Sequence, residues 1–251
     1  MKRILFLHAH PDDAEFLAAG TLALLAAAGH DITIATMTAG DCGSRQHGAR
    51  EIAEIRRGEA ERAAAILGAH YEWLGFSDLA IFVTDEARRT VTGALRRLRP
   101  DIVITASPAD YHCDHEATSK LVTDACFACS APNYAAPGGH PALDGIPHLY
   151  YADPAEGIDR DGRTVFPQFL VDVGAVIDTK RRMLEMHESQ RQWLAQQHGM
   201  GDYVAAMETW CRSRGALAGI AFGEGFRQYG GHAYPQTPLL QELVGRVLPV
   251  S

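Results

Sequence analysis

Short apolar runs alternate with longer, partly apolar segments over the first 130 residues of the chain. The apolar runs predict β-strands at residues 4–8, 31–37, 71–74 and 101–105. The segments between them have helical periodicity and stop at a glycine or a proline, which predicts helices over residues 14–28, 51–67 and 86–99. Strands that alternate with helices of this length indicate an α/β fold with right-handed crossovers. We therefore expect a Rossmann-like, mostly parallel sheet with helices on both faces.

The pattern changes after residue 130. Half of the 12 prolines lie within residues 131–169, together with several glycines, so this stretch predicts long irregular loops. Weaker strand and helix patterns also occur in this half, at residues 148–151, 169–173, 177–197 and 203–214. Long loops in a compact domain usually belong to a binding site or a lid.

The length of 251 residues allows one large hydrophobic core, and nothing in the pattern requires two. We expect a single domain over residues 1–251. Within it, residues 1–130 form the Rossmann-like half that carries the chemistry described below, and residues 131–251 form a loop-rich half that shapes the substrate site.

Composition and charge exclude several classes of protein. The hydrophobic and charged fractions, 47% and 22%, are those of an ordinary globular protein, and no apolar run approaches the roughly 18 residues of a membrane-spanning helix. A net charge of −8 argues against a nucleic-acid surface, which needs clustered Lys and Arg. The five cysteines are odd in number and do not frame a small disulfide-linked domain, so we expect a cytoplasmic protein.

A cluster of histidines and carboxylates directly follows the first predicted strand. The sequence from His8 to Glu15 reads His-Ala-His-Pro-Asp-Asp-Ala-Glu. Pro11 restrains His10 to an extended conformation, while the carboxylates that follow begin the next helix, where the helix dipole favours negative charge. An imidazole and a carboxylate in one tight turn suit Zn²⁺ or a similar divalent ion, so we expect His10 and Asp13 to bind one.

A second cluster, from Tyr111 to His115, follows the strand predicted at residues 101–105. Loops at the carboxyl ends of parallel strands gather at one edge of an open α/β sheet, so the two clusters should converge. His115 would then complete a set of three ligands and leave a fourth position for water, as in catalytic zinc sites. We expect zinc, although the same ligands also accept Fe²⁺, Co²⁺ or Mn²⁺.

The remaining polar residues of the two clusters suit catalytic roles. Asp12 is placed to act as a general base, and His112 to protonate a leaving amine or stabilise an oxyanion. Asp114 suits a carboxylate that orients an imidazole. Either cluster alone could equally be a helix cap without metal, but two such clusters after strands of one sheet favour a metal site. His8 is interpreted as support, and His187 as a helix-packing or site-lining residue.

These motifs resemble the LmbE/PIG-L family of zinc-dependent de-N-acetylases. Residues 9–15 match the family signature Ala-His-Pro-Asp-Asp-x-Glu, and residues 112–115 match His-x-Asp-His, with cysteine where proline is frequent. Weaker similarities lie at residues 38–41, 56–59, 75–78 and 187–190. The resemblance implies the same metal ligands, base and acid, and it adds Arg56 and Asp78 as residues that contact a substrate sugar.

The resemblance implies an enzyme that removes an acetyl group from a small N-acetylated sugar or glycoconjugate by attack of a zinc-bound water. It also implies assembly into trimers or hexamers. Two alternatives remain open: an amidase for a non-sugar or thiol-conjugate amide, and a binding protein that retains metal without turnover. The presence of both Asp12 and His112 favours an enzyme, because metal binding alone requires neither.

Overall fold

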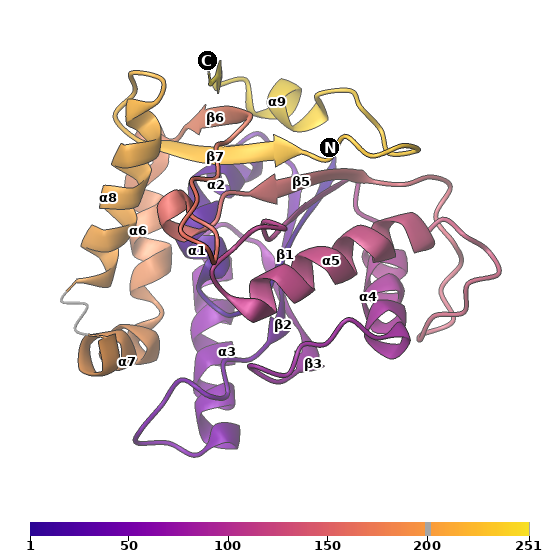
Figure 1. Ribbon diagram of the computed structural model, residues 1–251, viewed down its shortest axis with the longest axis horizontal. Helices are drawn as coiled ribbons and strands as arrows, with labels where there is room; N and C mark the ends of the chain where they lie inside the picture. Colours follow the sequence, from indigo (N-terminus) through magenta and orange to yellow (C-terminus); the bar gives the residue numbers. More distant parts are fainter. Residues whose placement is uncertain (199–201, 251) are drawn as a thin grey trace.

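The protein is described by a computed structural model that covers residues 1–198 and 202–250. Its core is one eight-stranded sheet in the order β3-β2-β1-β4-β5-β7-β6-β8 (Figure 1). The strands are β1 (Arg3–His8), β2 (Asp31–Thr38), β3 (His70–Phe76), β4 (Ile102–Thr105), β5 (His148–Ala152), β6 (Phe169–Asp172), β7 (Gly223–Gln228) and β8 (Val247–Pro249). The helices are α1 (Asp13–Leu17), α2 (Ala19–Ala27), α3 (Ala49–Ala65), α4 (Asp85–Leu98), α5 (Cys113–Ala128), α6 (Ile177–Glu185), α7 (Glu188–His198), α8 (Tyr203–Ala216) and α9 (Leu239–Val244).

The first five strands of the sheet are parallel, which confirms the predicted fold class. β1 pairs in parallel with both β2 and β4, and β4 pairs in parallel with β5. The chain runs outward from β1 to β3 and then returns to the other side of β1 as β4, so the strand order reverses between β1 and β4. The crevice beyond the carboxyl ends of two such strands is the usual ligand site of an open α/β sheet.

The other three strands extend the same sheet in antiparallel pairs, β5 with β7, β7 with β6, and β6 with β8. Of these, β7 and β8 have no counterpart among the predicted elements. Two glycines and three charged or amide side chains give β7 no clear alternation of polar and apolar positions. Strands from both halves of the chain therefore share one sheet.

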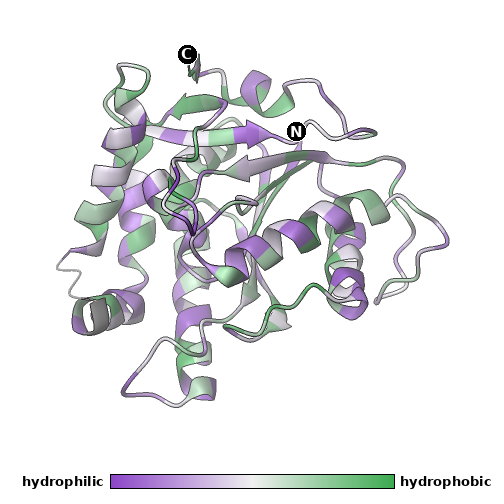
Figure 2. Cartoon of the chain, viewed as in Figure 1, coloured by the Kyte–Doolittle hydropathy of each residue, from purple (hydrophilic) through white to green (hydrophobic). Residues whose placement is uncertain are grey.

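Helices cover both faces of the sheet, as predicted. Side chains alternate along β1, so Ile4 and Phe6 pack on one face while Leu5 and Leu7 pack on the other. Helices α4 and α5 cover the second face, and the first face is covered by α1, α2, α6, α8 and α9 with part of α3 (Figure 1). Hydrophilic and hydrophobic residues alternate along these helices (Figure 2).

Two helices that the sequence predicts as continuous are divided. The helix expected over residues 14–28 breaks at Ala18, whose φ of −141° is not helical, and continues as α2. The break exposes the first amides of α2, and those of Gly20 and Thr21 donate to the carboxylate of Glu224, at 2.8 and 2.7 Å. The helix expected over residues 177–197 divides into α6 and α7 around the buried His187.

Among residues 1–198 and 202–250, no helix has the length and the apolar character needed to cross a bilayer.

Candidate metal and active site

The two histidine and carboxylate clusters meet at the carboxyl ends of β1 and β4. His10 Nδ1 lies 3.2 Å from His115 Nε2. The carboxylate of Asp13 lies between them, with Oδ2 at 3.5 Å from His10 Nδ1 and Oδ1 at 3.5 Å from His115 Nε2. The structure thus brings together the three side chains expected to hold a metal. Their role as ligands stays a prediction.

Each of these three side chains also contacts a further polar side chain. Asp114 Oδ2 lies 3.1 Å from His10 Nε2, so Asp114 contacts an imidazole as expected. His8 Nδ1 lies 2.6 Å from Asp13 Oδ2, which gives His8 the supporting place expected of it. Partners of this kind fix the orientation and tautomer of metal-binding side chains.

The third of these partners, Asp110, was not anticipated from the sequence. Its Oδ1 lies 3.0 Å from His115 Nδ1, and the residue is fully buried. The available signal was weak: an isolated carboxylate in the loop between β4 and α5, outside both motifs. Only the folded loop shows that this carboxylate faces His115.

The electrostatics of the cluster favour positive charge. Burial opposes the charged form of His10, but hydrogen bonds to Asp114 and Asp13 outweigh it and raise the pKa of His10 to about 9. Burial is likewise outweighed at His115, where Asp13 and Asp110 raise the pKa to about 10. The charges of His8 and His115 hold the pKa of the Asp13 carboxyl well below its usual range, although burial opposes this.

This donor set fits a divalent cation. Two imidazoles and one carboxylate are ligands that Zn²⁺ and related ions prefer, and three protein ligands are the number found in catalytic sites. Donor atoms of two overlapping trios lie close enough to share an ion, namely His10 with His112 and His115, and His8 with Asp13 and His115. The carboxylates that raise the pKa of the imidazoles would equally stabilise a bound cation.

Asp12 lies beside this cluster in a constrained position. It precedes α1 with φ of 95°, in the left-handed region that side chains rarely adopt. Arg56 Nη2 donates to Pro11 O at 2.7 Å and to Asp12 Oδ1 at 3.3 Å, and Tyr203 Oη donates to Asp12 Oδ2 at 2.8 Å. Both carboxylate oxygens are therefore held. Burial raises the pKa of Asp12, although the charge of Arg56 opposes the rise.

Tyr203 is a site residue that the sequence did not reveal. It begins α8, far along the chain from Asp12, and no motif surrounds it. Its ring stacks on Phe16 of α1 with centroids 5.4 Å apart, which aims its hydroxyl at Asp12.

His112 caps α5 at the entrance to the cluster. Its Nδ1 accepts the amide of Asp114 at 3.2 Å, and its ring stacks on that of His115 at a centroid distance of 4.9 Å. The ring of His10 meets it edge-on at 4.8 Å. Burial lowers the pKa of His112, and the neighbouring His10 and His115 lower it further.

The two residues expected to contact a sugar lie at different depths: Asp78 is at the rim of the site, and Arg56 is buried beneath this rim. Arg56 is only 3% exposed and points at Asp12, so the structure gives it a contact other than the one expected. Asp78 Oδ2 accepts the amide of Cys42 at 3.0 Å, while its Oδ1 is buried without a hydrogen-bond partner among the described residues. Contact of either residue with a sugar stays a prediction.

His187 does not line the candidate active site. It is completely buried, and its Nε2 lies 3.3 Å from Glu15 Oε2. Of the two interpretations of this histidine, the structure supports helix packing, because His187 occupies the junction of α6 and α7.

Comparison with known proteins identifies the fold and the motifs. The family model described as GlcNAc-PI de-N-acetylase (PIG-L) matches residues 5–126, which contain both histidine and carboxylate clusters. The segment at residues 5–126 is therefore similar to the LmbE/PIG-L family. The resemblance inferred from the two motifs is thereby confirmed.

Individual relatives of the chain are named for different activities. The diacetylchitobiose deacetylase of Thermococcus kodakarensis is 29% identical over 202 residues, which cover 76% of this chain and 70% of that protein. The solved diacetylchitobiose deacetylase of Pyrococcus horikoshii is 27% identical with a TM-score of 0.76, covering 95% of this chain and 88% of that one. The 4-oxalmesaconate hydratase of Pseudomonas putida is 27% identical over 187 residues, covering 71% of this chain and 70% of that protein.

Proposed function

We propose that this protein is a metal-dependent hydrolase that removes an acetyl group from a small N-acetylated sugar or glycoconjugate. The observation that carries the proposal is the convergence of His10, Asp13 and His115, with the buried Asp12 adjacent to Asp13 in the chain and the ring of His112 stacked on that of His115. A general base, a general acid and a cation site in one crevice are the groups that hydrolysis of an amide requires. Relatives named as deacetylases of N-acetylated sugars support this reaction class.

His10, Asp13 and His115 would hold the metal, which we expect to be zinc, with Fe²⁺, Co²⁺ or Mn²⁺ as alternatives. A divalent ion there would polarise the amide carbonyl and make a water molecule more acidic. Asp114, Asp110 and His8 hold the three ligand side chains in place.

Asp12 would accept the proton of the attacking water. Its carboxylate is fixed through both oxygens, by Arg56 on one side and Tyr203 on the other. A base held in this way loses little entropy when water and substrate approach, and a pKa raised by burial brings it nearer to neutral pH.

His112 would donate the proton that the departing amine needs, and before that a hydrogen bond to the developing oxyanion. Its place at the N-terminus of α5, beside both other imidazoles, puts its ring at the mouth of the crevice. Asp114 contributes by orienting His10. Water attack, collapse of the tetrahedral species and protonation of nitrogen yield acetate and a free amine.

The substrate would lie between the cluster and the rim formed by Asp78. The buried, unpartnered Oδ1 of Asp78 offers an acceptor for a sugar hydroxyl. Arg56 would act on the sugar only through a rearrangement of the rim, because its guanidinium is buried against Asp12.

We extend the proposal to the whole chain: one deacetylase domain over residues 1–251, with the metal site in residues 1–130 and the substrate loops in residues 131–251. The cytoplasm is the proposed location, and a homotrimer or homohexamer the proposed assembly. No nucleic-acid or membrane partner is proposed.

Release of acetate tests this function. Zinc-loaded protein is incubated with N-acetylglucosamine, its oligosaccharides, its glycoconjugates and a set of non-sugar amides, and acetate is measured together with metal content. Turnover of an N-acetylated sugar is the expected result, and His115→Ala should lose both metal and turnover. A preference for a non-sugar amide would replace the sugar assignment by an amidase. Because one relative is named as a 4-oxalmesaconate hydratase, 4-oxalmesaconate is included, and hydration of it without acetate release would contradict the proposal.

A further inference from the structure

Asp110 reaches His115 from the loop at residues 106–112, which joins β4 to α5. Its Oδ1 lies 3.0 Å from His115 Nδ1, so the position of this loop decides how the imidazole of a proposed metal ligand is oriented. The same oxygen accepts the amide of His112 at 3.0 Å, which fixes Asp110 toward α5. The contacts that fix the other end of the loop therefore bear on the metal site as well.

Ser107 holds that other end of the loop. The residue is completely buried, and its Oγ donates to Ala109 O at 2.6 Å and accepts the amide of Ala109 at 3.2 Å. A hydroxyl group can donate one hydrogen bond and accept two. The turn from Ser107 to Ala109 thus leaves one acceptor position on Oγ, directly before Asp110 in the chain.

Arg227 occupies this position. Its Nη2 donates to Ser107 Oγ at 2.7 Å. Because a guanidinium has no acceptor, the hydrogen of the Ser107 hydroxyl cannot point toward Arg227 and stays directed at Ala109 O. Arg227 lies on β7, opposite Tyr151 of β5, and outside the residues 5–126 that match the family model. One bond therefore ties the antiparallel part of the sheet to the loop that carries Asp110.

The environment of Arg227 is unfavourable for a charged side chain. Burial lowers the pKa of Arg227, although the charge of Asp153 opposes this, and its Nε is buried without a hydrogen-bond partner among the described residues. Arg214 Nε already lies 3.0 Å from Asp153 Oδ2, so one carboxylate faces two guanidiniums. Pairing with Asp153 therefore does not by itself explain a guanidinium at this place, whereas the bond to Ser107 does.

We propose that Arg227 is a positioning residue of the metal site. It acts through Ser107 and Asp110 on the orientation of His115, and it contacts neither metal nor substrate itself. The inference rests on the proposed function, because it takes His115 to be a ligand. Without Arg227 the Ser107 hydroxyl is free to turn, and the loop at residues 106–112 no longer holds Asp110 in one place.

Titration of the metal-free protein with Co²⁺ tests this role, because Co²⁺ suits the same ligands and its visible spectrum reports their number and geometry. Arg227→Met removes the donor and keeps an unbranched side chain. It should lower the affinity for Co²⁺ roughly tenfold, the lower end of the loss expected for partners of metal-binding side chains, and shift the spectrum. Ser107→Ala should have the same effect with less change in packing. The double variant should lose no more than either single variant, since both break one path.

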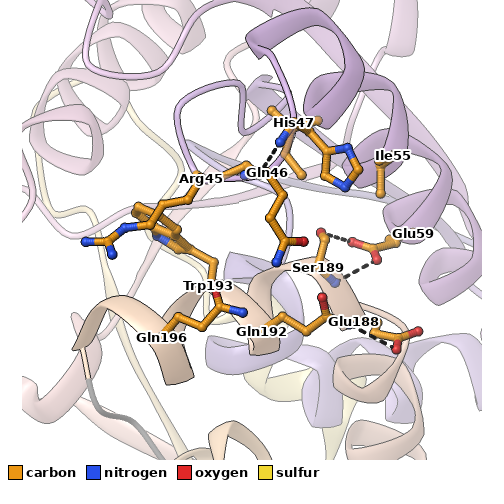
Figure 3. Close-up of a pocket in the computed structure, with 13 residues that line it drawn as sticks. Arg45, Gln46, His47, Ile55, Glu59, Glu188, Ser189, Gln192, Trp193 and Gln196 are labelled. Carbon is orange, nitrogen blue, oxygen red and sulfur yellow. Dashed lines mark hydrogen bonds between the residues drawn. The ribbon is translucent and has the colours of Figure 1, made fainter.

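Arg214→Met and Ser189→Ala are the matched controls. Arg214 is another buried guanidinium beside Asp153. Ser189 bonds the carboxylate of Glu59 through its amide and its hydroxyl, at the wall of a polar cavity between α3 and α7 (Figure 3). Neither control residue has a hydrogen bond to residues 106–112 in the described part of the chain. Both variants should keep the wild-type spectrum and an affinity within about twofold of wild type, whatever they cost in stability.

The inference is overturned if Arg227→Met and Ser107→Ala keep wild-type affinity and spectrum, if the controls change them equally, or if the losses add in the double variant. If Arg227→Met does not fold, the result with Ser107→Ala decides. Wild-type protein that binds Co²⁺ but releases no acetate would contradict the proposed function alone, because the affinities still test Arg227. Wild-type protein that binds no Co²⁺ would overturn both, since His115 would then not be a ligand.

Discussion

Two buried polar clusters in this molecule are built from similar groups but differ in whether the protein itself balances their charges. In the first, here called the β7 cluster, the carboxylate of Glu224 accepts four hydrogen bonds. They come from the amides of Gly20 and Thr21, the hydroxyl of Thr21, and Lys180 Nζ at 2.5 Å. Burial opposes the charge on Lys180, but contacts with Cys211 and Glu224 raise its pKa. Charge and hydrogen bonds are complete within the protein itself.

The second, the metal cluster of His10, Asp13 and His115, is not balanced in this way. Three carboxylates, Asp13 among them, contact its two imidazoles and raise their pKa values to about 9 and 10, even though both imidazoles are buried. A cluster that attracts protons so strongly suits a cation that the chain does not supply. A buried network whose charges and hydrogen bonds are complete supports the fold, whereas an unbalanced one indicates a ligand.

The largest effect expected from breaking the metal cluster is on catalysis. Asp12→Asn should keep the metal and the fold but lose about 10² to 10⁴ in kcat, the usual contribution of a general base. Asp13→Asn should instead lose metal, because one of three ligands is weakened. Steady-state kinetics with elemental analysis separates the two variants. If Asp12→Asn lost metal and Asp13→Asn retained it, the two roles would be exchanged.

Substitution in the β7 cluster should lower the free energy of unfolding and leave catalysis unchanged. Glu224→Gln leaves Lys180 buried without a counter-charge, which costs about 3 to 5 kcal/mol in the free energy of unfolding. Urea denaturation measures this loss, and folded protein should retain its kcat and metal. Asp161→Asn, which breaks the exposed pair with Arg163, serves as control and should leave stability near the wild-type value. A cost as small as that of the control would show that the network is not structural.

The elements that hold the metal cluster were predictable because their signals are local. β1 and β4 are short apolar runs, and the residues that follow them carry both motifs, so the amino-acid sequence alone places His10, Asp13 and His115 at one sheet edge. The strand bounds of the first half agree with the pattern to within a few residues, as do those of α3 and α4, whereas the helix expected over residues 14–28 is divided and α5 has no predicted counterpart.

What the sequence did not reveal depends on contacts between distant segments. The break at Ala18 is explained only by Glu224, some 200 residues later, which binds the freed amides of α2. Tyr203 reaches Asp12 across a similar separation in the chain. Single side chains without a repeating pattern give no periodic signal, so neither pairing could be inferred from composition or spacing.

A buried ion pair between Asp153 and Arg214 is intermediate in charge balance between the two clusters. Arg214 Nε lies 3.0 Å from Asp153 Oδ2, yet burial outweighs the charges of Arg214 and Arg227 and raises the pKa of Asp153 to about 6. The unfolded carboxyl titrates near pH 4, so between about pH 4 and 6 the native state keeps a proton that the unfolded state releases. Stability should therefore fall as pH rises through this window.

The expected loss through the window is about 3 kcal/mol for this one group. Urea denaturation of wild type and Asp153→Asn at several pH values between 4 and 7 checks it, and the difference between the two curves isolates Asp153 from the other titrating groups. Asp153→Asn should lack this component of the pH dependence. Parallel curves for the two proteins would show that Arg214 keeps the carboxylate ionised throughout, as in the complete β7 cluster.

The smallest effect should come from Tyr203, which touches the reacting centre only through Asp12. Tyr203→Phe removes the hydrogen bond to Asp12 Oδ2 and keeps the stacking on Phe16, while Arg56 still holds Oδ1. We expect kcat to fall about tenfold, in keeping with the loss of one hydrogen bond to a charged group, with KM and metal content unchanged. Tyr71→Phe is the control, because Tyr71 is also a largely buried tyrosine but bonds Thr36 at 2.7 Å, and it should leave kcat near wild type. A rise in KM at constant kcat would place Tyr203 against the substrate instead, and equal effects in both variants would mean that the hydroxyl serves only the fold.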